Sequence, residues 1–330
     1  MNATLSASPL LTLEDVAKTF GGEKKLFGKK TPAVHAVQGL SVNVRKGEIL
    51  GVVGESGCGK STLARLIVGL DLPTSGTISF DGEDLTALAR KDRRALSRKV
   101  QYVFQDPVAS LNPRKTIRTI LEAPLKHLTD LDAHGREDRL QELLSAVNLA
   151  PEFLERYPHE FSGGQAQRIG IARALAASPE LIVLDEPVSA LDVSVQAQVL
   201  NLLDTLKDKF GLTYIFISHD LSVVESVSDR VAVMYFGRLA ELGPSAQIFQ
   251  SALHPYTDLL MRSAPAPGRK ELFAEDANAS LPDPYNPPQG CAFAARCPAA
   301  SKLCSTQRPA SDEASRTAGN HIAACHHPLS

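Results

Sequence analysis

No stretch of the 330-residue sequence approaches the roughly 18 to 20 consecutive apolar residues that a membrane-spanning helix needs. The first basic residue is Lys18, so the start of the chain lacks the positively charged region of a secretory signal. We therefore expect a protein that stays on the cytosolic side of the membrane and has no membrane span of its own.

The sequence also lacks an excess of charge of either sign. Its 35 Lys and Arg residues oppose 37 Asp and Glu residues, for a net charge of -2, and nothing in this balance indicates nucleic-acid binding. Cysteine is scarce, with five residues, and because disulfides are rare in the cytosol we expect free thiols or metal ligands. A hydrophobic share of 43% and the chain length suit a soluble protein with one large and one small domain.

The order of apolar and helical patterns predicts an α/β fold. "EILGVVG" (48–54), "ELIVLDEP" (180–187) and "TYIFISHD" (213–220) resemble buried strands, and a helical stretch covers 193–209. Strands that alternate with helices favour a parallel sheet. Residues 107–162 contain helical patterns and no convincing strand, so we expect a helical insertion there. A late hairpin is expected around Gly237, where "VAVMYF" and "RLAELG" meet.

"GESGCGKS" follows the first of these strands and precedes a helical pattern, the context that the phosphate-binding motif G-x-x-x-x-G-K-[ST] requires. In that motif the glycines let backbone N–H groups surround phosphate oxygens at a helix N-terminus. Lys60 would reach the β- and γ-phosphates, and the Ser61 hydroxyl would bind Mg²⁺. At Cys58 only the backbone would matter. A glycine-rich turn without a ligand is the alternative. The predicted nucleotide-binding residues are Gly54, Glu55, Ser56, Gly57, Cys58, Gly59, Lys60, Ser61 and Thr62.

"LIVLDEP" narrows the class of nucleotide-binding protein. Its apolar residues form a strand that ends at Asp185, which can hold Mg²⁺ through water. The next residue, Glu186, is predicted to be the general base that accepts a proton from the attacking water. The alternative is a strand that merely ends in an acidic turn.

"FSGGQ" opens a further helical pattern. Ser162 and Gln165 have the S-x-x-Q spacing of a capping box, so the simplest interpretation is a helix start. The two glycines beside the cap, Gly163 and Gly164, bare the backbone and make a second anion site. Because the phosphate loop of the same chain does not need that site, we interpret it as a contact to the ATP of a second molecule.

With these motifs in this order, residues 10–262 resemble the ATP-binding cassette (ABC) ATPases. The resemblance rests on the phosphate loop, Gln105, "FSGGQ", "LIVLDEP", "SALD" and His219. It implies a P-loop NTPase core with a helical subdomain at about 107–162. It also implies two cassettes stacked head to tail, with each ATP held between the phosphate loop of one and the signature residues of the other. Phe161 departs from the leucine usual in the family, but both side chains are apolar.

The resemblance also implies roles for single residues. His219 matches the residue that contacts the γ-phosphate and orients the water. Gln105 matches the residue that touches Mg²⁺ and senses the transporter, and Asp192 matches the loop that crosses between subunits. Phe20 lies where the family places an aromatic ring on the adenine, although Phe27 or a plain core role for Phe20 remains an alternative.

Three segments are similar to the importers of dipeptides, oligopeptides and nickel: "VFQDPVASLNPR", "HPYTDLLMRSAPAP" and "LPDPYNPPQGCAFAARCP". The last two resemble a C-terminal extension of that branch, so we expect a Pro-rich linker at 263–285 and a cysteine region at 286–330. The partners implied are a second ATPase subunit, usually non-identical, two membrane permeases and, indirectly, an external substrate-binding protein. ATP and Mg²⁺ would be required, and the subunit would sit peripherally at the cytoplasmic face of the membrane. Peptides are the expected cargo; nickel, glutathione-like and opine-like compounds stay open.

Four cysteines lie close together in this extension, with spacings C-x5-C, C-x6-C and C-x20-C: Cys291, Cys297, Cys304 and Cys325. Four thiolates suit a 4Fe-4S cluster or a zinc ion. The first two spacings are longer than those typical of zinc fingers, which favours the cluster, while His326 and His327 keep zinc open. Free thiols are the third alternative. A bound group would serve as a structural clip for a short tail.

Other classes of function fit the sequence less well. A non-transport ABC ATPase of DNA repair or of the ribosome usually has a long coiled-coil insert, tandem cassettes or a basic surface, and none is visible here. A nucleotide kinase or GTPase would leave "FSGGQ" without a role. An inactive subunit is disfavoured because Lys60, Asp185, Glu186 and His219 are all present.

Overall fold

Strands that are apolar along their whole length form the centre of the main sheet. A computed structural model describes residues 8–22, 32–263, 281–310, 316–317 and 320–329. Every residue of β3 (Ile49–Val53), β7 (Leu181–Asp185) and β8 (Thr213–Ile217) is buried, as expected of strands that are covered on both faces. In the described part of the chain this sheet has eight strands in the order β11-β12-β10-β9-β3-β8-β7-β6, and those from β9 to β6 are parallel. The remaining strands are β6 (Val100–Val103), β9 (Arg230–Tyr235), β10 (Arg238–Pro244), β11 (Arg316–Thr317) and β12 (His321–Ala323).

The two faces of this sheet pack against different helices. Because side chains alternate along a strand, Val183 of β7 packs on the side of α1 (Lys60–Ile67), and Leu184 packs on the side of α6 (Gly163–Leu175) and α7 (Val193–Phe210). A parallel sheet between helices confirms the predicted α/β class. The predicted hairpin is also confirmed, since β9 and β10 pair in antiparallel fashion.

A second sheet covers the outer side of α1. Its strands are antiparallel in the order β2-β1-β4-β5, and its buried side chains share one core with α1 and β3. No pattern in the sequence predicted this sheet. It consists of β1 (Leu11–Gly21), β2 (Ala33–Val44), β4 (Ser75–Phe80) and β5 (Glu83–Asp84), and it is followed by α2 (Leu85–Lys91) and α3 (Arg93–Lys99).

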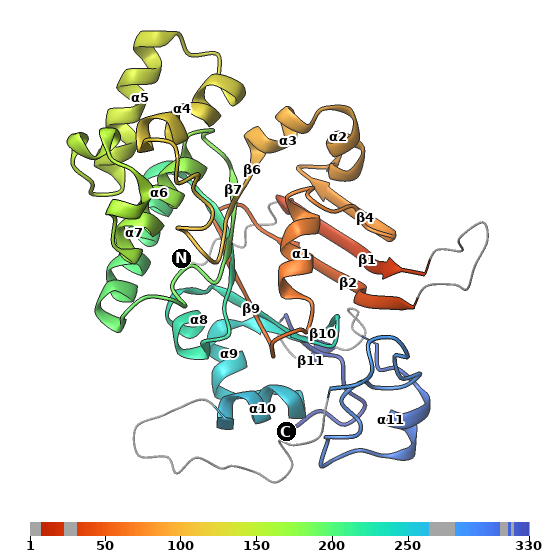
Figure 1. Ribbon diagram of the computed structural model, residues 1–330. Coiled ribbons are helices and arrows are strands. Elements are labelled where there is room, and N and C mark those ends of the chain that lie inside the picture. Colours follow the sequence, from red (N-terminus) through yellow and green to blue (C-terminus); the bar gives the residue numbers. More distant parts are fainter. Residues whose placement is uncertain (1–7, 23–31, 264–280, 311–315, 318–319, 330) are drawn as a thin grey trace.

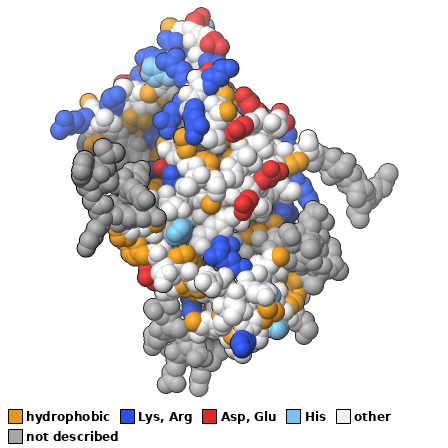
Figure 2. Space-filling view, turned by 90° about the vertical axis from the view of Figure 1, so that its right-hand side faces the viewer, with side chains coloured by type: hydrophobic (Ala, Val, Ile, Leu, Met, Phe, Trp, Pro, Cys, Tyr) orange, Lys and Arg blue, Asp and Glu red, His pale blue; other side chains and the backbone are white. Residues whose placement is uncertain are grey.

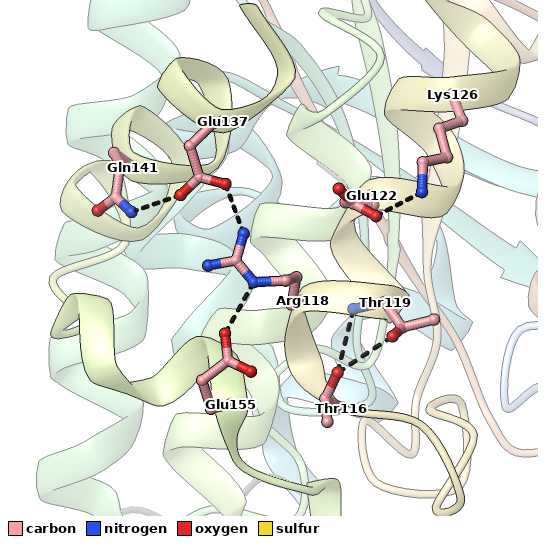
Figure 3. Close-up of polar contacts among 8 residues, drawn as sticks. All are labelled: Thr116, Arg118, Thr119, Glu122, Lys126, Glu137, Gln141 and Glu155. Carbon is pink, nitrogen blue, oxygen red and sulfur yellow. Dashed lines mark hydrogen bonds and ion pairs between the residues drawn. The ribbon is translucent and has the colours of Figure 1, made fainter. Parts of the chain in front are cut away.

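Residues 107–162 contain only helices, which project from one end of the sheet (Figure 1). They are α4 (Ile117–Leu128), α5 (Ala133–Ala146), η1 (Pro151–Glu155) and η2 (Pro158–Glu160). Arg118 of α4 ties three of them together, because its guanidinium pairs with Glu137 of α5 and lies 2.8 Å from Oε1 of Glu155 in η1 (Figure 3). Hydrogen bonds to these carboxylates raise the pKa of Arg118. The helical segment is thus held together by charge as well as by its leucines.

The C-terminal extension joins the main sheet. Its strand β12 pairs with β10, and Phe293 is buried in the core cluster that includes α6 and α7. In Figure 1 the extension lies below the cassette, beside β10 and α10. The predicted linker falls mostly at 264–280, outside the described residues. The remaining described helices are α8 (Leu221–Val227), α9 (Ser245–Gln250) and α10 (Pro255–Ser263), which precede the linker, and α11 (Lys302–Thr306) in the extension.

In the described part of the chain, no helix is both long enough and apolar enough to cross a membrane. The face shown in Figure 2 carries basic and acidic side chains beside one another, and neither sign covers it.

Candidate functional site

The glycine loop between β3 and α1 has a backbone that only glycine permits at two positions. Gly54 and Gly59 have φ angles of 151° and 105°, and a Cβ at these residues would lie 2.2 Å from the carbonyl O of Met234 and 2.3 Å from that of Ala36. The Lys60 ammonium donates to the carbonyls of the loop itself, at 2.7 Å from that of Gly54. The loop therefore curls around its own lysine, as a phosphate-binding loop does.

Next to the loop, two oxygen groups lie where Mg²⁺ is predicted. The Ser61 hydroxyl donates to Oδ1 of Asp185 at 3.4 Å, and Asp185 is buried at the end of β7. Hydroxyl and carboxylate oxygens are the donors that Mg²⁺ prefers, so these residues fit the ion. The other carboxylate oxygen, Oδ2, accepts a hydrogen bond of 2.5 Å from the Tyr102 hydroxyl.

Tyr102 is not among the site residues predicted from the sequence. It lies on β6, the neighbour of β7 in the sheet, and packs on the same side as α1 and Ser61. Burial and the hydrogen bond to Asp185 raise its pKa, so the hydroxyl stays protonated and donates. A tyrosine that donates to a metal-binding carboxylate fixes the orientation of that carboxylate. The sequence gives no signal for it, because the contact depends on which strand lies beside β7.

Replacing Tyr102 by Phe is expected to weaken the apparent Mg²⁺ affinity of ATP hydrolysis about 10-fold, because an outer-shell partner of the metal site is lost. Turnover at saturating Mg²⁺ should stay near the wild-type value. The measurement is the ATPase rate as a function of free Mg²⁺ at fixed ATP. The matched control is Tyr214→Phe, which removes a hydroxyl that donates to the Leu203 carbonyl at 3.0 Å on the opposite face of the sheet. Equal Mg²⁺ affinity in both variants would contradict the assignment.

Glu186, directly after β7, lies against two other predicted site residues. The Gln105 amide donates to Oε2 of Glu186 at 2.8 Å, and Nδ1 of His219 lies 3.1 Å from Oε1. Glu186 itself has a positive φ of 49°, and its backbone N–H donates to the carbonyl of Ile217 at 2.9 Å. Because β7 and β8 are adjacent and parallel, the residues that follow them emerge side by side. The Glu186 carboxylate and the His219 ring are thereby brought together at the carboxyl ends of β7 and β8.

The FSGGQ segment forms the start of α6. The Ser162 N–H donates to Oε1 of Gln165 at 3.1 Å, and Ser162 Oγ accepts from the Gln165 N–H at 3.4 Å, so the predicted capping box is present. A Cβ at Gly164 would lie 2.5 Å from Cγ1 of Val195, which explains a glycine at this position. Ser162 and Gly163 are exposed to solvent.

Not every predicted residue joins this cluster. Among the described residues, no hydrogen bond or ion pair links 162–165 to the phosphate loop, and α6 lies on the face of the sheet opposite to α1. Asp192 is exposed at the start of α7 and its side chain makes no capping bond. Phe20 on β1 is 40% exposed, with the Lys18 ammonium 4.9 Å from its ring centre. An exposed ring is available for stacking, but its role stays a prediction.

The four C-terminal cysteines line one small pocket together with His254, His326 and His327. Burial raises the pKa of three of these thiols, that of Cys325 to about 11, so they are protonated at neutral pH. In the part of the chain that the structure describes, no group of three His, Cys, Asp or Glu side chains is arranged to hold a metal ion. The described side chains thus form no metal site for the predicted cluster or for zinc, but the four thiols lie in one pocket.

Comparison with known proteins identifies the class. Residues 37–189 match the family described as ABC transporter, and residues 240–304 match the oligopeptide/dipeptide transporter C-terminal region. The chain is 50% identical over 321 residues to the oligopeptide transport ATP-binding protein AppF of Bacillus subtilis, covering 96% of this chain and 97% of AppF. It is 46% identical over 328 residues to the dipeptide transport ATP-binding protein DppF of Haemophilus influenzae, covering 98% and 99%. A solved dimer of the ATP-binding cassette MJ0796 with ADP and Pi has a TM-score of 0.63 at 29% identity, covering 71% of this chain and 98% of that one.

The chain therefore belongs to the ABC transporter family. It is a transport ATPase with an ABC-type P-loop fold, and it requires ATP and Mg²⁺. Within the family, it carries the C-terminal region of the oligopeptide and dipeptide transporters. Both bacterial relatives are named as transport proteins, which favours transport over the alternative of a non-transport ABC ATPase.

Proposed function

We propose that this chain is the ATP-hydrolysing subunit of an importer of dipeptides or oligopeptides. The observation that carries the proposal is the match over nearly the whole chain to ATP-binding proteins named for oligopeptide and dipeptide transport, C-terminal region included. ATP binding and hydrolysis would be coupled to uptake, because ATP binds the closed arrangement of two cassettes better than the open one.

The geometry around the phosphate loop supports a mechanism for hydrolysis. Lys60 would leave the loop carbonyls to bind the β- and γ-phosphates, and backbone N–H groups at the start of α1 would bind the remaining oxygens. Ser61 and Asp185 would hold Mg²⁺, which when bound neutralises charge that develops on the phosphates. Glu186 would take the proton of the attacking water, because a carboxylate within hydrogen-bond reach of that water can act as base.

Two neighbours of Glu186 would prepare it for this step. His219 would orient the water and contact the γ-phosphate, and it already lies within hydrogen-bond distance of Oε1. Gln105 would exchange its bond to Oε2 for contacts to Mg²⁺ when the helical subdomain moves. In this arrangement Gln105 couples the state of the permease to the reaction centre.

The reaction centre would be completed by a second ATPase subunit. Ser162, Gly163, Gly164 and Gln165 lie at the start of α6, where Ser162 and Gly163 are exposed and where N–H groups and the positive end of the helix dipole favour an anion. The similar cassette MJ0796 has been solved as a dimer. We propose that these residues contact the ATP of the partner subunit, that Asp192 lies at the crossing between subunits, and that the partner is a non-identical ATPase.

Two membrane permeases and an external substrate-binding protein complete the proposed assembly. The helical segment 107–162 would contact the permeases from the cytoplasmic face of the membrane.

A Lys60→Met variant tests the proposed transport in cells whose wild-type copy is deleted. Uptake of a labelled tripeptide is expected to fall to the level of cells without the transporter. The control is Lys302→Met, on the surface of α11.

Affinity purification of the tagged wild-type chain in mild detergent should recover two membrane proteins and a second ATPase. Normal peptide uptake in cells with the Lys60→Met variant would contradict the cargo class. Recovery of the chain without any membrane protein would contradict the assembly.

We further propose that the four C-terminal cysteines hold a 4Fe-4S cluster. Their common pocket, their spacings and the chemistry of four thiol donors support it. The thiols of a cluster bind different iron atoms and so lie further apart than the four ligands of one zinc ion, whose sulfurs are each about 2.3 Å from the metal. The cluster would clip the extension to the cassette.

Anaerobically purified wild-type protein is expected to contain about four iron atoms per chain and matching sulfide, with visible absorbance. The Cys297→Ser variant should lose most of the iron, and Cys58→Ser, in the phosphate loop, should retain it. Zinc in place of iron, or neither metal, would reject the cluster in favour of the two alternatives.

A further inference from the structure

The C-terminal extension reaches the phosphate loop through one arginine. Arg296 directly precedes Cys297. Its two terminal guanidinium nitrogens each donate to one carboxylate oxygen of Glu55, both at 2.9 Å. The Arg296 side chain is only 8% exposed and that of Glu55 is 26% exposed. A bidentate pair between residues 241 positions apart therefore joins the extension to the second residue of the glycine loop.

Aromatic rings fix the position of this arginine. Its guanidinium carbon lies 5.6 Å from the ring centre of Phe293 and 5.9 Å from that of Tyr235. Both rings belong to the buried core, so the guanidinium has little freedom. The hydrogen bonds to Glu55 raise the pKa of Arg296 further above its usual range.

Glu55 is held at its backbone as well. Its N–H donates to the Tyr256 hydroxyl at 2.9 Å, and its carbonyl accepts from the Lys60 ammonium at 3.0 Å. Tyr256 lies at the start of α10, in the segment that precedes the extension, and is fully buried. The C-terminal part of the chain thus holds both the side chain and the backbone of one residue of the phosphate loop.

The negative charge of Glu55 makes the contact with Arg296 important for ATP binding. A carboxylate in a loop built for a triphosphate would repel the ligand, since like charges at short range raise the free energy of binding. Arg296 cancels that charge and restrains the loop at the same time. Nothing in the glycine-loop motif itself requires an acidic side chain at this position.

We propose that Arg296 is a positioning residue of the nucleotide site: by neutralising and holding Glu55, it lets the C-terminal extension set the affinity of the phosphate loop for ATP. The proposal rests on the ATPase activity of the family and is independent of the cargo and of any metal at the cysteines.

Equilibrium titration of the full-length chain with ATP tests it. Arg296→Met is expected to raise the Kd for ATP about 10-fold and to raise KM by a similar factor with little change in kcat, because an unpaired carboxylate then faces the phosphates. Glu55→Gln, which leaves Arg296 uncompensated, is expected to bind ATP as well as the wild type or more tightly. The Arg296→Met/Glu55→Gln double variant should return to within about 3-fold of the wild-type Kd, because the repelling charge is gone.

The matched control is Arg308→Met in the same extension, where the arginine donates to the carbonyls of Gln289 and Pro288 and not to the loop. Its Kd should match the wild type. Thermal melting establishes that each variant is folded. A wild-type Kd in Arg296→Met, or a double variant as weak as Arg296→Met, overturns the proposal. If Arg296→Met does not fold, the Glu55→Gln variant alone tests the proposal. A Kd for ATP raised more than 5-fold in Glu55→Gln then overturns the proposal.

Discussion

Replacing Glu186 by Gln is expected to lower ATP turnover by about 10²- to 10⁴-fold, the usual contribution of a general base, while ATP binding is retained. Gln has the same size and can still accept a hydrogen bond from Gln105, but it cannot take a proton at neutral pH. ATP should therefore stay bound, and ATP-bound dimers should accumulate. Steady-state phosphate release measures the first effect, and light scattering with and without ATP measures the second.

The matched control for this variant is Glu225→Gln, an exposed glutamate on α8. It changes the net charge by the same amount and should hydrolyse ATP at the wild-type rate. Near-normal hydrolysis by the Glu186→Gln protein would remove Glu186 from the role of base. The roles proposed for His219 and Gln105 would then also fail, because both depend on Glu186 acting as the base.

Replacing Ser162 by Ala is expected to lower turnover about 10²-fold, because a donor aimed at the developing charge of the partner's ATP is lost. The same change removes a helix cap, which by itself costs only about 1 kcal/mol of stability. The two effects separate in the assay, since loss of a cap lowers the melting temperature and leaves turnover unchanged. Turnover per chain should also fall on dilution, as the dimer dissociates.

Thr116→Ala provides the comparison for the cap. Thr116 is the cap of α4, where its hydroxyl accepts from the Thr119 N–H at 3.4 Å (Figure 3). This variant should lose stability to a similar extent and keep its ATPase rate. Equal rates in the Ser162→Ala and Thr116→Ala proteins would show that Ser162 only starts a helix, and the two-subunit reaction centre would have to be abandoned.

Much of the site could be predicted from the sequence because its parts are local motifs. The backbone of the glycine loop needs residues without a Cβ at Gly54 and Gly59, and both lie within one short sequence motif. The apolar runs of β7 and β8 predicted strands. Residues that follow adjacent parallel strands meet at one edge of the sheet, and Glu186 and His219 lie together there.

The antiparallel sheet and the docking of the extension were not predicted. Strand β1 has exposed, intermediate and buried residues in an irregular order, and its pairing with β2 contains register shifts, so no clean period of two marks it. Strand β12 has only three residues, too few for a pattern, and it exists because β10 offers an edge to pair with. Such elements depend on partners far away in the sequence.

The sequence by itself predicted the chemistry that we propose for this protein: a loop for phosphates, oxygen ligands for Mg²⁺, a base, and a helix start that contacts a second subunit. Only the tertiary structure decided which side chains tune that chemistry. Tyr102 reaches Asp185 because β6 lies beside β7, and Arg296 reaches Glu55 because the extension packs against β10 and the rings of the core. Contacts of this kind depend on strand order and packing, which no short stretch of sequence specifies.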